Sequence, residues 1–145
     1  MAQKTILVVD DEAGIAEPLA AALLDQGYRV LTAANGEEGL TIARREKIEL
    51  AIVDVMMPPG LRLTGVTSRE RTGVYVIQQL RSLYPKLPVF CLSVRIDEET
   101  VSAVQRVGAR FLRKGETSLK HVLELVEATL RMAPGSSATI RRWSG

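Results

Sequence analysis

Short apolar segments alternate along the chain with segments that have a helical period. Five of the apolar segments have the length of a β-strand and are rich in branched residues: 5–9, 29–33, 49–55, 88–94 and 110–113. In the first, third and fourth of them polar and apolar residues hardly alternate, which is typical of strands covered on both faces. The pattern therefore predicts three well-buried strands and two weaker ones.

The helical segments between these strands have apolar residues at every third or fourth position. The last segment has the clearest stripe, made by Leu119, Val122, Leu123, Val126 and Leu130. Pro18 interrupts the first helical segment and removes a hydrogen bond to Gly14, so that helix should begin late or bend. Five strand-then-helix units predict an α/β fold, in which a parallel sheet carries helices on both faces, because crossovers between parallel strands are nearly always right-handed.

The length of 145 residues suits one domain, which we expect to span residues 1–133. Residues 134–145 are small and polar, and we interpret them as a flexible tail or a truncated linker. A second irregular stretch, 59–72, carries one glutamate and three arginines: Arg62, Arg69 and Arg71.

Composition and charge exclude several classes of protein. Nineteen Lys and Arg residues face seventeen Asp and Glu residues, and the surplus lies at Arg141 and Arg142, so we expect no direct nucleic-acid or membrane-surface contact. The single cysteine, Cys91, excludes an internal disulfide and a cysteine-rich zinc site. The N-terminal apolar run is too short for a signal peptide, and no stretch reaches the ~20 apolar residues of a membrane span. We therefore expect a soluble cytoplasmic protein.

The candidate chemistry lies at the carboxyl ends of the predicted strands, where open α/β sheets bind their ligands. The side chains at these ends are Asp10, Asp11, Glu12, Asp54, Ser93 and Lys114. Two carboxylates about 4 Å apart repel by on the order of 4 kcal/mol at an effective dielectric constant of about 20. Such a group stays ionised only around a cation, and Mg²⁺ fits best because it uses few carboxylates and keeps several waters.

Each of these residues also has an ordinary explanation when it is taken alone. Asp10 or Asp11 suits a helix N-cap. Asp54 suits an exposed loop, Ser93 a strand end and Lys114 a solvated surface position. Their common position at one edge of one sheet favours a joint functional site.

Four sequence features together resemble the receiver domain of two-component response regulators, over about residues 4–131. They are Ile-Leu-Val-Val-Asp-Asp-Glu at 6–12, Asp-Val-Met-Met-Pro at 54–58, Ser93 after an apolar strand, and Phe-Leu-Arg-Lys at 111–114. The resemblance implies a flavodoxin-like fold, with five parallel strands in the order 2-1-3-4-5 and helices on both faces. It also implies either a stand-alone receiver or part of a longer regulator.

The same resemblance implies Mg²⁺-dependent phosphoryl transfer from a histidine kinase or a phosphotransfer protein to Asp54. The Mg²⁺ ligands would be Asp10 through a water, Asp11, Asp54 and the backbone carbonyl of Met56. Lys114 and Ser93 would hold phosphoryl oxygens, so that positioning and charge neutralisation do most of the catalysis. The domain would then catalyse its own phosphorylation and dephosphorylation and turn over no separate substrate.

By this resemblance, phosphorylation acts as a switch. Ser93 would move toward the new phosphoryl group, and Phe111 would turn inward. The face formed by the fourth helix, the fifth strand and the fifth helix would change shape and bind a downstream protein or an output domain.

The chain departs from the family pattern at four positions. The family glycine after the proline is Gly73, so roughly eleven residues are inserted, either as a tolerated surface loop or as one whose arginines reach a partner or the phosphoryl site. Val94 replaces a small residue and would narrow access to Asp54. Gly115 replaces a proline, which makes the family's cis peptide unfavourable by ~3 kcal/mol. Phe111 replaces the commoner tyrosine.

Three other functions compete with this one. An aspartate-nucleophile phosphatase would need a second Asp two residues after Asp54, where Met56 stands. A nucleotide or flavin binder would need a Gly-rich loop after the first strand, where three acids stand instead. A receiver-like interaction domain that is not phosphorylated stays open, because Val94 and Gly115 are unusual for the family.

Overall fold

In the computed structural model, which describes residues 3–95 and 97–132, five parallel strands lie in the order β2-β1-β3-β4-β5. They are β1 (Thr5–Val9), β2 (Arg29–Ala33), β3 (Leu50–Asp54), β4 (Val89–Ser93) and β5 (Arg110–Arg113). All five predicted strands are present, and the predicted order is confirmed; β3 and β4 are each one residue shorter at both ends than expected. The tail predicted at 134–145 lies outside the described residues.

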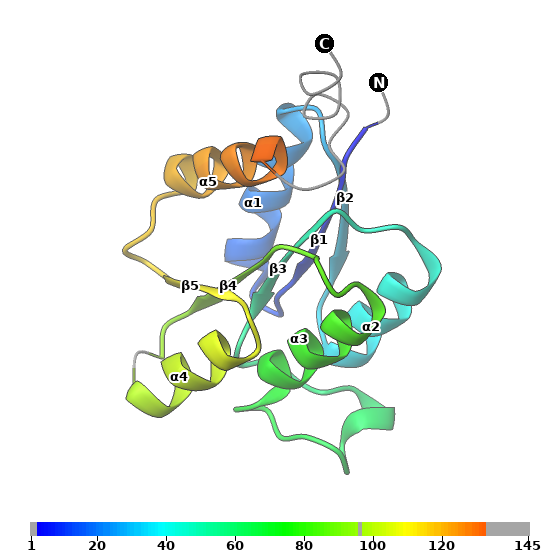
Figure 1. Ribbon diagram of the computed structural model, residues 1–145. Coiled ribbons are helices and arrows are strands. Elements are labelled where there is room, and N and C mark those ends of the chain that lie inside the picture. The colour runs from blue at the N-terminus through cyan, green and yellow to red at the C-terminus, as the bar shows by residue number, and fades with distance from the viewer. Residues whose placement is uncertain (1–2, 96, 133–145) are drawn as a thin grey trace.

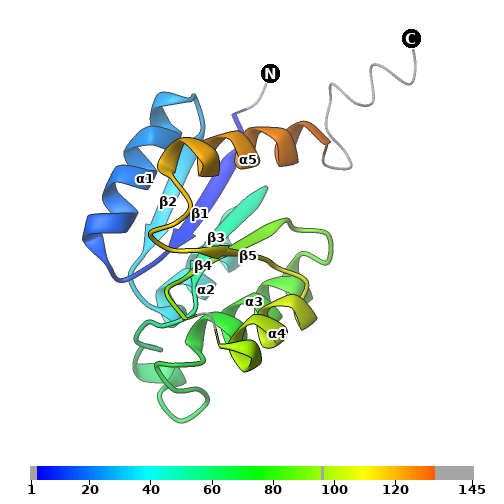
Figure 2. The same ribbon diagram turned by 90° about the vertical axis from the view of Figure 1, so that its left-hand side faces the viewer.

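Helices cover both faces of this sheet (Figures 1 and 2). They are α1 (Ala13–Asp25), α2 (Gly36–Arg45), α3 (Thr72–Leu83), α4 (Glu98–Arg106) and α5 (Leu119–Met132). Successive side chains of β1 point to opposite faces of the sheet. Ile6 and Val8 pack on the face covered by α1 and α5, whereas Leu7 and Val9 pack on the face covered by α2, α3 and α4. β1, β3 and β4 are buried along their whole length, as their lack of alternation predicted. In the part of the chain that is described, no helix is both long and apolar enough to cross a bilayer.

Local signals set the ends of the helices. The Asp97 side chain caps α4 by accepting a hydrogen bond from the Thr100 amide at 3.0 Å. α1 begins at Ala13, so the expectation of a late start at Pro18 is wrong. The helix accommodates Pro18 because the carbonyl that loses its partner belongs to Gly14, which is exposed and open to solvent.

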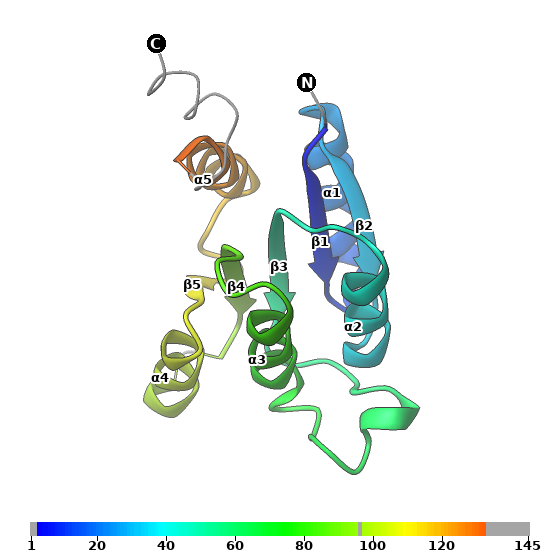
Figure 3. The same ribbon diagram turned by 45° about the vertical axis from the view of Figure 1, so that its right-hand side comes forward.

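The inserted stretch 59–72 leaves the sheet after β3 and projects beyond α2 and α3 (Figure 3). It contains a short 3₁₀ helix, η1 (Leu61–Leu63), which the sequence pattern did not indicate. The beginning of the stretch is tied to α2: the Glu37 amide donates to the Pro59 carbonyl at 2.8 Å, and the Glu37 carboxylate accepts from the Arg62 amide at 3.0 Å. Its later part returns to the end of β3, where the Met57 amide donates to the Arg69 carbonyl at 3.2 Å.

Gly73 allows α3 to approach the end of β3 closely. Its amide donates to the Val55 carbonyl at 2.8 Å, and a Cβ at this position would lie 2.1 Å from the carbonyl oxygen of Asp54. Only a residue without a side chain fits in that space. The contact fixes the backbone on which the Asp54 carboxylate is carried.

Candidate functional site

The ends of four strands place side chains at one edge of the sheet. Asp10 directly follows β1, Asp54 ends β3, Ser93 ends β4 and Lys114 directly follows β5. Because all four strands are parallel, their carboxyl ends lie together. The structure thus brings these predicted site residues, which are distant in sequence, to a single edge.

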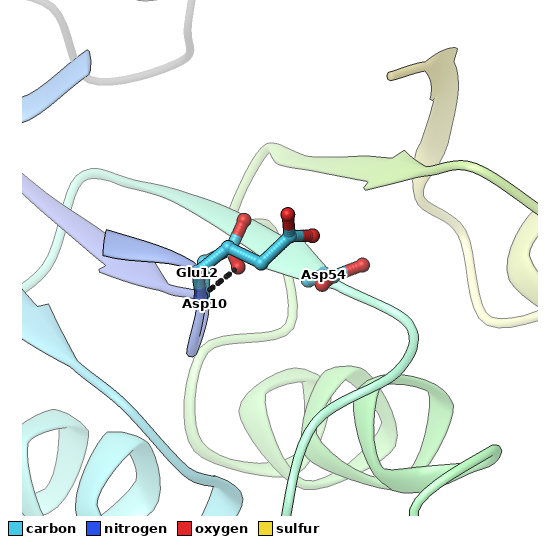
Figure 4. Close-up of side chains that lie close together, drawn as sticks. All are labelled: Asp10, Glu12 and Asp54. Carbon is cyan, nitrogen blue, oxygen red and sulfur yellow. Dashed lines mark hydrogen bonds between the residues drawn. The ribbon is translucent and has the colours of Figure 1, made fainter. Parts of the chain in front are cut away.

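Lys114 lies at the centre of the site. Its Nζ is 3.1 Å from Asp10 Oδ2, 3.0 Å from Asp54 Oδ2 and 2.6 Å from Glu12 Oε1. The side chains of Lys114, Asp10 and Asp54 are only 4–6% exposed, whereas that of Glu12 is 57% exposed. Figure 4 shows the three carboxylates, with the Glu12 side chain extending toward Asp54 and its amide bonded to Asp10. A buried ammonium group therefore joins two buried carboxylates to a third at the surface.

The surroundings perturb the ionisation of both Asp54 and Lys114. Burial raises the pKa of the Asp54 carboxyl from 3.8 to about 6; hydrogen bonds from Lys114 and the Met56 amide lower it, and the charge of Asp10 raises it further. Burial opposes the charge on Lys114, but its contacts with Glu12, Asp54 and Asp10 outweigh that effect and raise the pKa of the ammonium. At neutral pH most of Asp54 is therefore ionised beside a charged lysine.

Glu12, and not Asp11, completes the acidic group. Carboxylate oxygens of Asp10, Glu12 and Asp54 all lie within 4.8 Å of one another. Asp11, predicted as a magnesium ligand, instead forms an ion pair with Arg69, with 2.9 Å between Asp11 Oδ2 and Arg69 Nη2. Glu12 was visible in the sequence as the third acid after β1, but spacing alone does not tell which of three adjacent acids turns toward Lys114.

Arg69 is a second cation at this edge, and residue spacing gave no signal that singled it out from the other two arginines of the stretch. It belongs to the inserted stretch 59–72, and its carbonyl accepts a hydrogen bond from the Met57 amide at 3.2 Å. Its side chain is 50% exposed, while that of Asp11 is 20% exposed. The other two arginines of the stretch pair with glutamates of α2 and α4. One arginine of the insertion thus reaches an acid that follows β1, while the other two lie against neighbouring helices.

Ser93 and Phe111, the two predicted switch residues, lie on the neighbouring strands β4 and β5. Ser93 is 1% exposed, and its Oγ accepts a hydrogen bond from the Arg95 amide at 2.9 Å. This bond leaves the hydroxyl proton free to be donated to a ligand at the sheet edge. Phe111, opposite Cys91 in the sheet, is partly buried against the core that α2, α3 and α4 cover.

Two departures from the family pattern lie beside the site. Val94, expected to narrow access to Asp54, is 65% exposed, so most of its surface faces solvent. Gly115 has a φ of +84°, a conformation that favours glycine, and its peptide bond with Lys114 is trans.

The donor set fits a hard divalent cation. The side chains that gather here are Asp10, Asp11, Glu12, Asp54, Arg69 and Lys114. Four carboxylates thus face two cationic groups, so these six side chains carry an excess of two negative charges when all are ionised. Carboxylate oxygens are the ligands that Mg²⁺ and Ca²⁺ prefer, and one divalent ion would balance the excess. The chain therefore presents a group that can hold such an ion.

The chain also matches a known family in sequence. It matches the family model described as "Response regulator receiver domain" over residues 6–126. The "probable transcriptional regulatory protein TcrX" of Mycobacterium tuberculosis is 31% identical over 128 residues, which are 88% of this chain and 50% of that protein. The chain spans about half or less of the length of the curated relatives it matches first.

Solved structures show the same fold. The chemotaxis response regulator CheY4 of Vibrio cholerae is 29% identical, with a TM-score of 0.73 over 89% of this chain and 100% of that one. A response regulator of Burkholderia pseudomallei, solved "with a phosphorylated aspartic acid, calcium ion and citrate", is 28% identical, with a TM-score of 0.69 over 87% of this chain and 72% of that one. These likenesses extend over almost the whole described sheet and its helices.

Proposed function

Because the chain belongs to the family of response regulator receiver domains, we propose that Asp54 is the residue of this two-component signalling module that accepts a phosphoryl group. One observation carries the proposal: the Asp54 carboxylate ends β3, is almost fully buried and lies 3.0 Å from the Lys114 ammonium. The likeness to the Burkholderia protein with its phosphorylated aspartic acid supports the same chemistry. The proposed donor is a histidine kinase or a phosphotransfer protein.

The proposed reaction transfers the group from a histidine to an aspartate. A carboxylate oxygen of Asp54 attacks the phosphorus of a phosphohistidine, an O–P bond forms as the P–N bond breaks, and the imidazole leaves with the bonding electrons while its second nitrogen carries the proton that keeps it neutral. The product is an acyl phosphate on Asp54. Positioning and neutralisation of charge supply most of the rate, because the transferred group spreads its charge over three oxygens.

Lys114 is the proposed cationic partner of the phosphoryl group. Its ammonium is held in place by Asp10 and Glu12 as well as by Asp54, so it stands ready before the donor arrives. A fixed and buried cation stabilises the charge of the transition state without having to reorganise. The buried Ser93 hydroxyl is the proposed donor to a second phosphoryl oxygen.

Mg²⁺ is the proposed cofactor, held by Asp10 through a water, by Asp11 and Asp54, and by the backbone carbonyl of Met56. The all-oxygen donor set and the excess of two negative charges support this assignment. When bound, the ion would supply charge neutralisation for the carboxylates and for phosphoryl oxygens. Arg69 pairs with Asp11 Oδ2, so an ion bound to Asp11 would share this carboxylate with the guanidinium or displace it.

The face of α4, β5 and α5 is the proposed output surface. The Arg95 amide, in the loop after β4, donates to Ser93 Oγ. If the Ser93 hydroxyl moves to donate to a phosphoryl oxygen, this loop would move with it. Phe111 on β5 is partly buried, so a shift of that loop changes the space into which its ring can turn. The proposed partner is a downstream protein or an output domain, and we expect no direct nucleic-acid contact by this part of the chain.

The test is incubation with acetyl phosphate and Mg²⁺, followed by intact-protein mass spectrometry. Wild type and Asp25→Asn, which alters an exposed aspartate at the end of α1, should each gain one phosphoryl group. Asp54→Asn should gain none. Lys114→Ala should be labelled more slowly than Arg95→Ala, whose side chain pairs with a surface carboxylate. Labelling of Asp54→Asn to the level of wild type would show that the acceptor is another residue.

A further inference from the structure

The inserted stretch 59–72 places a cation on one of the acids that the proposed function assigns to the metal. The Arg69 guanidinium lies 2.9 Å from Asp11, and Lys114 contacts Asp10, Glu12 and Asp54 instead. The two cations thus divide the four carboxylates between them. Asp11 is the one carboxylate of the four that pairs with Arg69 of the insertion and not with Lys114.

Two hydrogen bonds hold the backbone at Arg69. Its carbonyl accepts from the Met57 amide at 3.2 Å, two residues before the stretch begins. The Thr72 hydroxyl, at the start of α3, donates to the Ser68 carbonyl at 2.9 Å. Arg69 and the residue before it, Ser68, are therefore anchored by their carbonyls to the end of β3 and the start of α3, and the Arg69 side chain reaches Asp11 from this position.

Arg69 Nη2 pairs with Asp11 Oδ2. A divalent ion bound to either oxygen of the same carboxylate would lie within about 5 Å of the guanidinium, where the two cations repel each other. We propose that Arg69 is a positioning residue that competes with the divalent cation for Asp11, so that metal binding and release of the insertion are coupled. The inference rests on the proposed function, because it takes Asp11 as a metal ligand. By this inference, the insertion lowers the affinity of the site for the divalent cation.

The size of the effect follows from the geometry of the pair. Half-exposed ion pairs such as Arg69–Asp11 stabilise a protein by about 0.2–1 kcal/mol, which leaves Asp11 unpaired in a minor fraction of molecules. The apparent dissociation constant of a ligand rises by the inverse of the competent fraction. Removing the Arg69 side chain should therefore lower the Kd for Mg²⁺ by about two- to six-fold.

The experiment is a calorimetric titration of the unphosphorylated full chain with MgCl₂ at constant ionic strength. Four variants are compared with wild type: Arg69→Gln, Arg62→Gln, Asp11→Asn and the double variant Arg69→Gln/Asp11→Asn. Arg62→Gln is the matched control, because it removes the same charge from the same stretch, where Arg62 pairs with Glu37. A competition for Asp11 predicts tighter Mg²⁺ binding in Arg69→Gln, no change in Arg62→Gln, and loss of the gain when Asp11 is absent.

Equal Kd values for Mg²⁺ in wild type and Arg69→Gln would overturn the inference. It would also be overturned if Arg69→Gln lowered the Kd equally in the Asp11→Asn background, because the effect would then come from the removed positive charge alone and not from Asp11. Absence of Mg²⁺ binding in both wild type and Arg69→Gln would overturn the inference together with the proposed metal site. Phosphorylation of Asp54 is scored separately, so tighter binding in Arg69→Gln without labelling of Asp54 would support the inference while refuting the proposed function.

A second readout follows from reciprocity. If Arg69 and Mg²⁺ compete for Asp11, bound Mg²⁺ must weaken the Arg69–Asp11 ion pair by the same factor. Loss of this pair should in turn loosen the stretch that carries Arg69. Hydrogen exchange of the Met57 amide, which donates to the Arg69 carbonyl, should accelerate when Mg²⁺ is added to wild type. Unchanged or slower exchange at Met57 in the Mg²⁺-bound protein would contradict the coupling.

Discussion

Neutralising Asp54 should stabilise the metal-free protein at neutral pH. Burial raises the pKa of this carboxyl to about 6, whereas in the unfolded chain it titrates near its ordinary value of 3.8. The folded state therefore holds the proton more firmly than the unfolded state does. Stability that is present at low pH is lost as the pH rises from about 4 through about 6, and above that range the loss is complete. Asp54→Asn removes the ionisation and hence the loss.

The magnitude follows from the same values. The difference between 3.8 and about 6 corresponds to roughly 3 kcal/mol of free energy of unfolding. The substitution also takes one partner from Lys114, which keeps Asp10 at 3.1 Å and Glu12 at 2.6 Å. Loss of one charged hydrogen bond offsets part of the gain, so we expect Asp54→Asn to be more stable by about 1–3 kcal/mol near pH 7.5.

Urea unfolding followed by far-UV circular dichroism in EDTA measures this directly. The gain of Asp54→Asn over wild type should shrink steadily as the pH falls toward about 4, with an unchanged m value. Asp25→Asn, at an exposed position, should track wild type within about 0.5 kcal/mol at every pH. A destabilised Asp54→Asn at neutral pH, or a difference from wild type that does not vary with pH, would refute the account of a buried carboxylate whose pKa is raised by burial.

Three further substitutions test the scaffold around the site by urea unfolding. Gly73→Ala would bring a Cβ to 2.1 Å from a backbone carbonyl of β3 and should cost on the order of 3 kcal/mol, whereas Gly65→Ala, with open space around it, should stay within about 0.5 kcal/mol of wild type. Arg81 donates to three backbone carbonyls in the α3–β4 and α4–β5 connections, so Arg81→Ala should cost about 2–3 kcal/mol, and lysine at this position should not restore it. Tyr84→Phe removes a hydroxyl that donates at 2.8 Å to two carbonyls at the end of α2 and should cost about 1 kcal/mol; a neutral result would show that water replaces it.

The strands and the position of the acceptor could be predicted because they depend on local properties. Asp54 interrupts the apolar run of the third predicted strand one residue before its expected end at residue 55, and β3 ends at this aspartate. Lys114 follows its own strand in the same way, and parallel topology then brings the two together. The burial of β1, β3 and β4 likewise follows from their unbroken apolar character.

The distribution of charges within the site could not be predicted, because it depends on contacts between distant segments. Three adjacent acids follow β1, and the turn into α1 decides that Glu12 contacts Lys114 while Asp11 pairs with Arg69. Arg69 reaches Asp11 only because the insertion folds back along α2 and the end of β3. The Glu12–Lys114 contact and the Arg69–Asp11 pair both join segments far apart in the chain. Residue spacing within one segment therefore could not predict either of them.

The most direct test of the account identifies the phosphorylated residue in the wild-type chain without any substitution. The protein is treated with acetyl phosphate and Mg²⁺, the acyl phosphate is reduced with borohydride to an alcohol, and tandem mass spectrometry locates the altered aspartate. The account predicts conversion at Asp54. Conversion at Asp10, Asp11 or Glu12, with Asp54 unchanged, would contradict it.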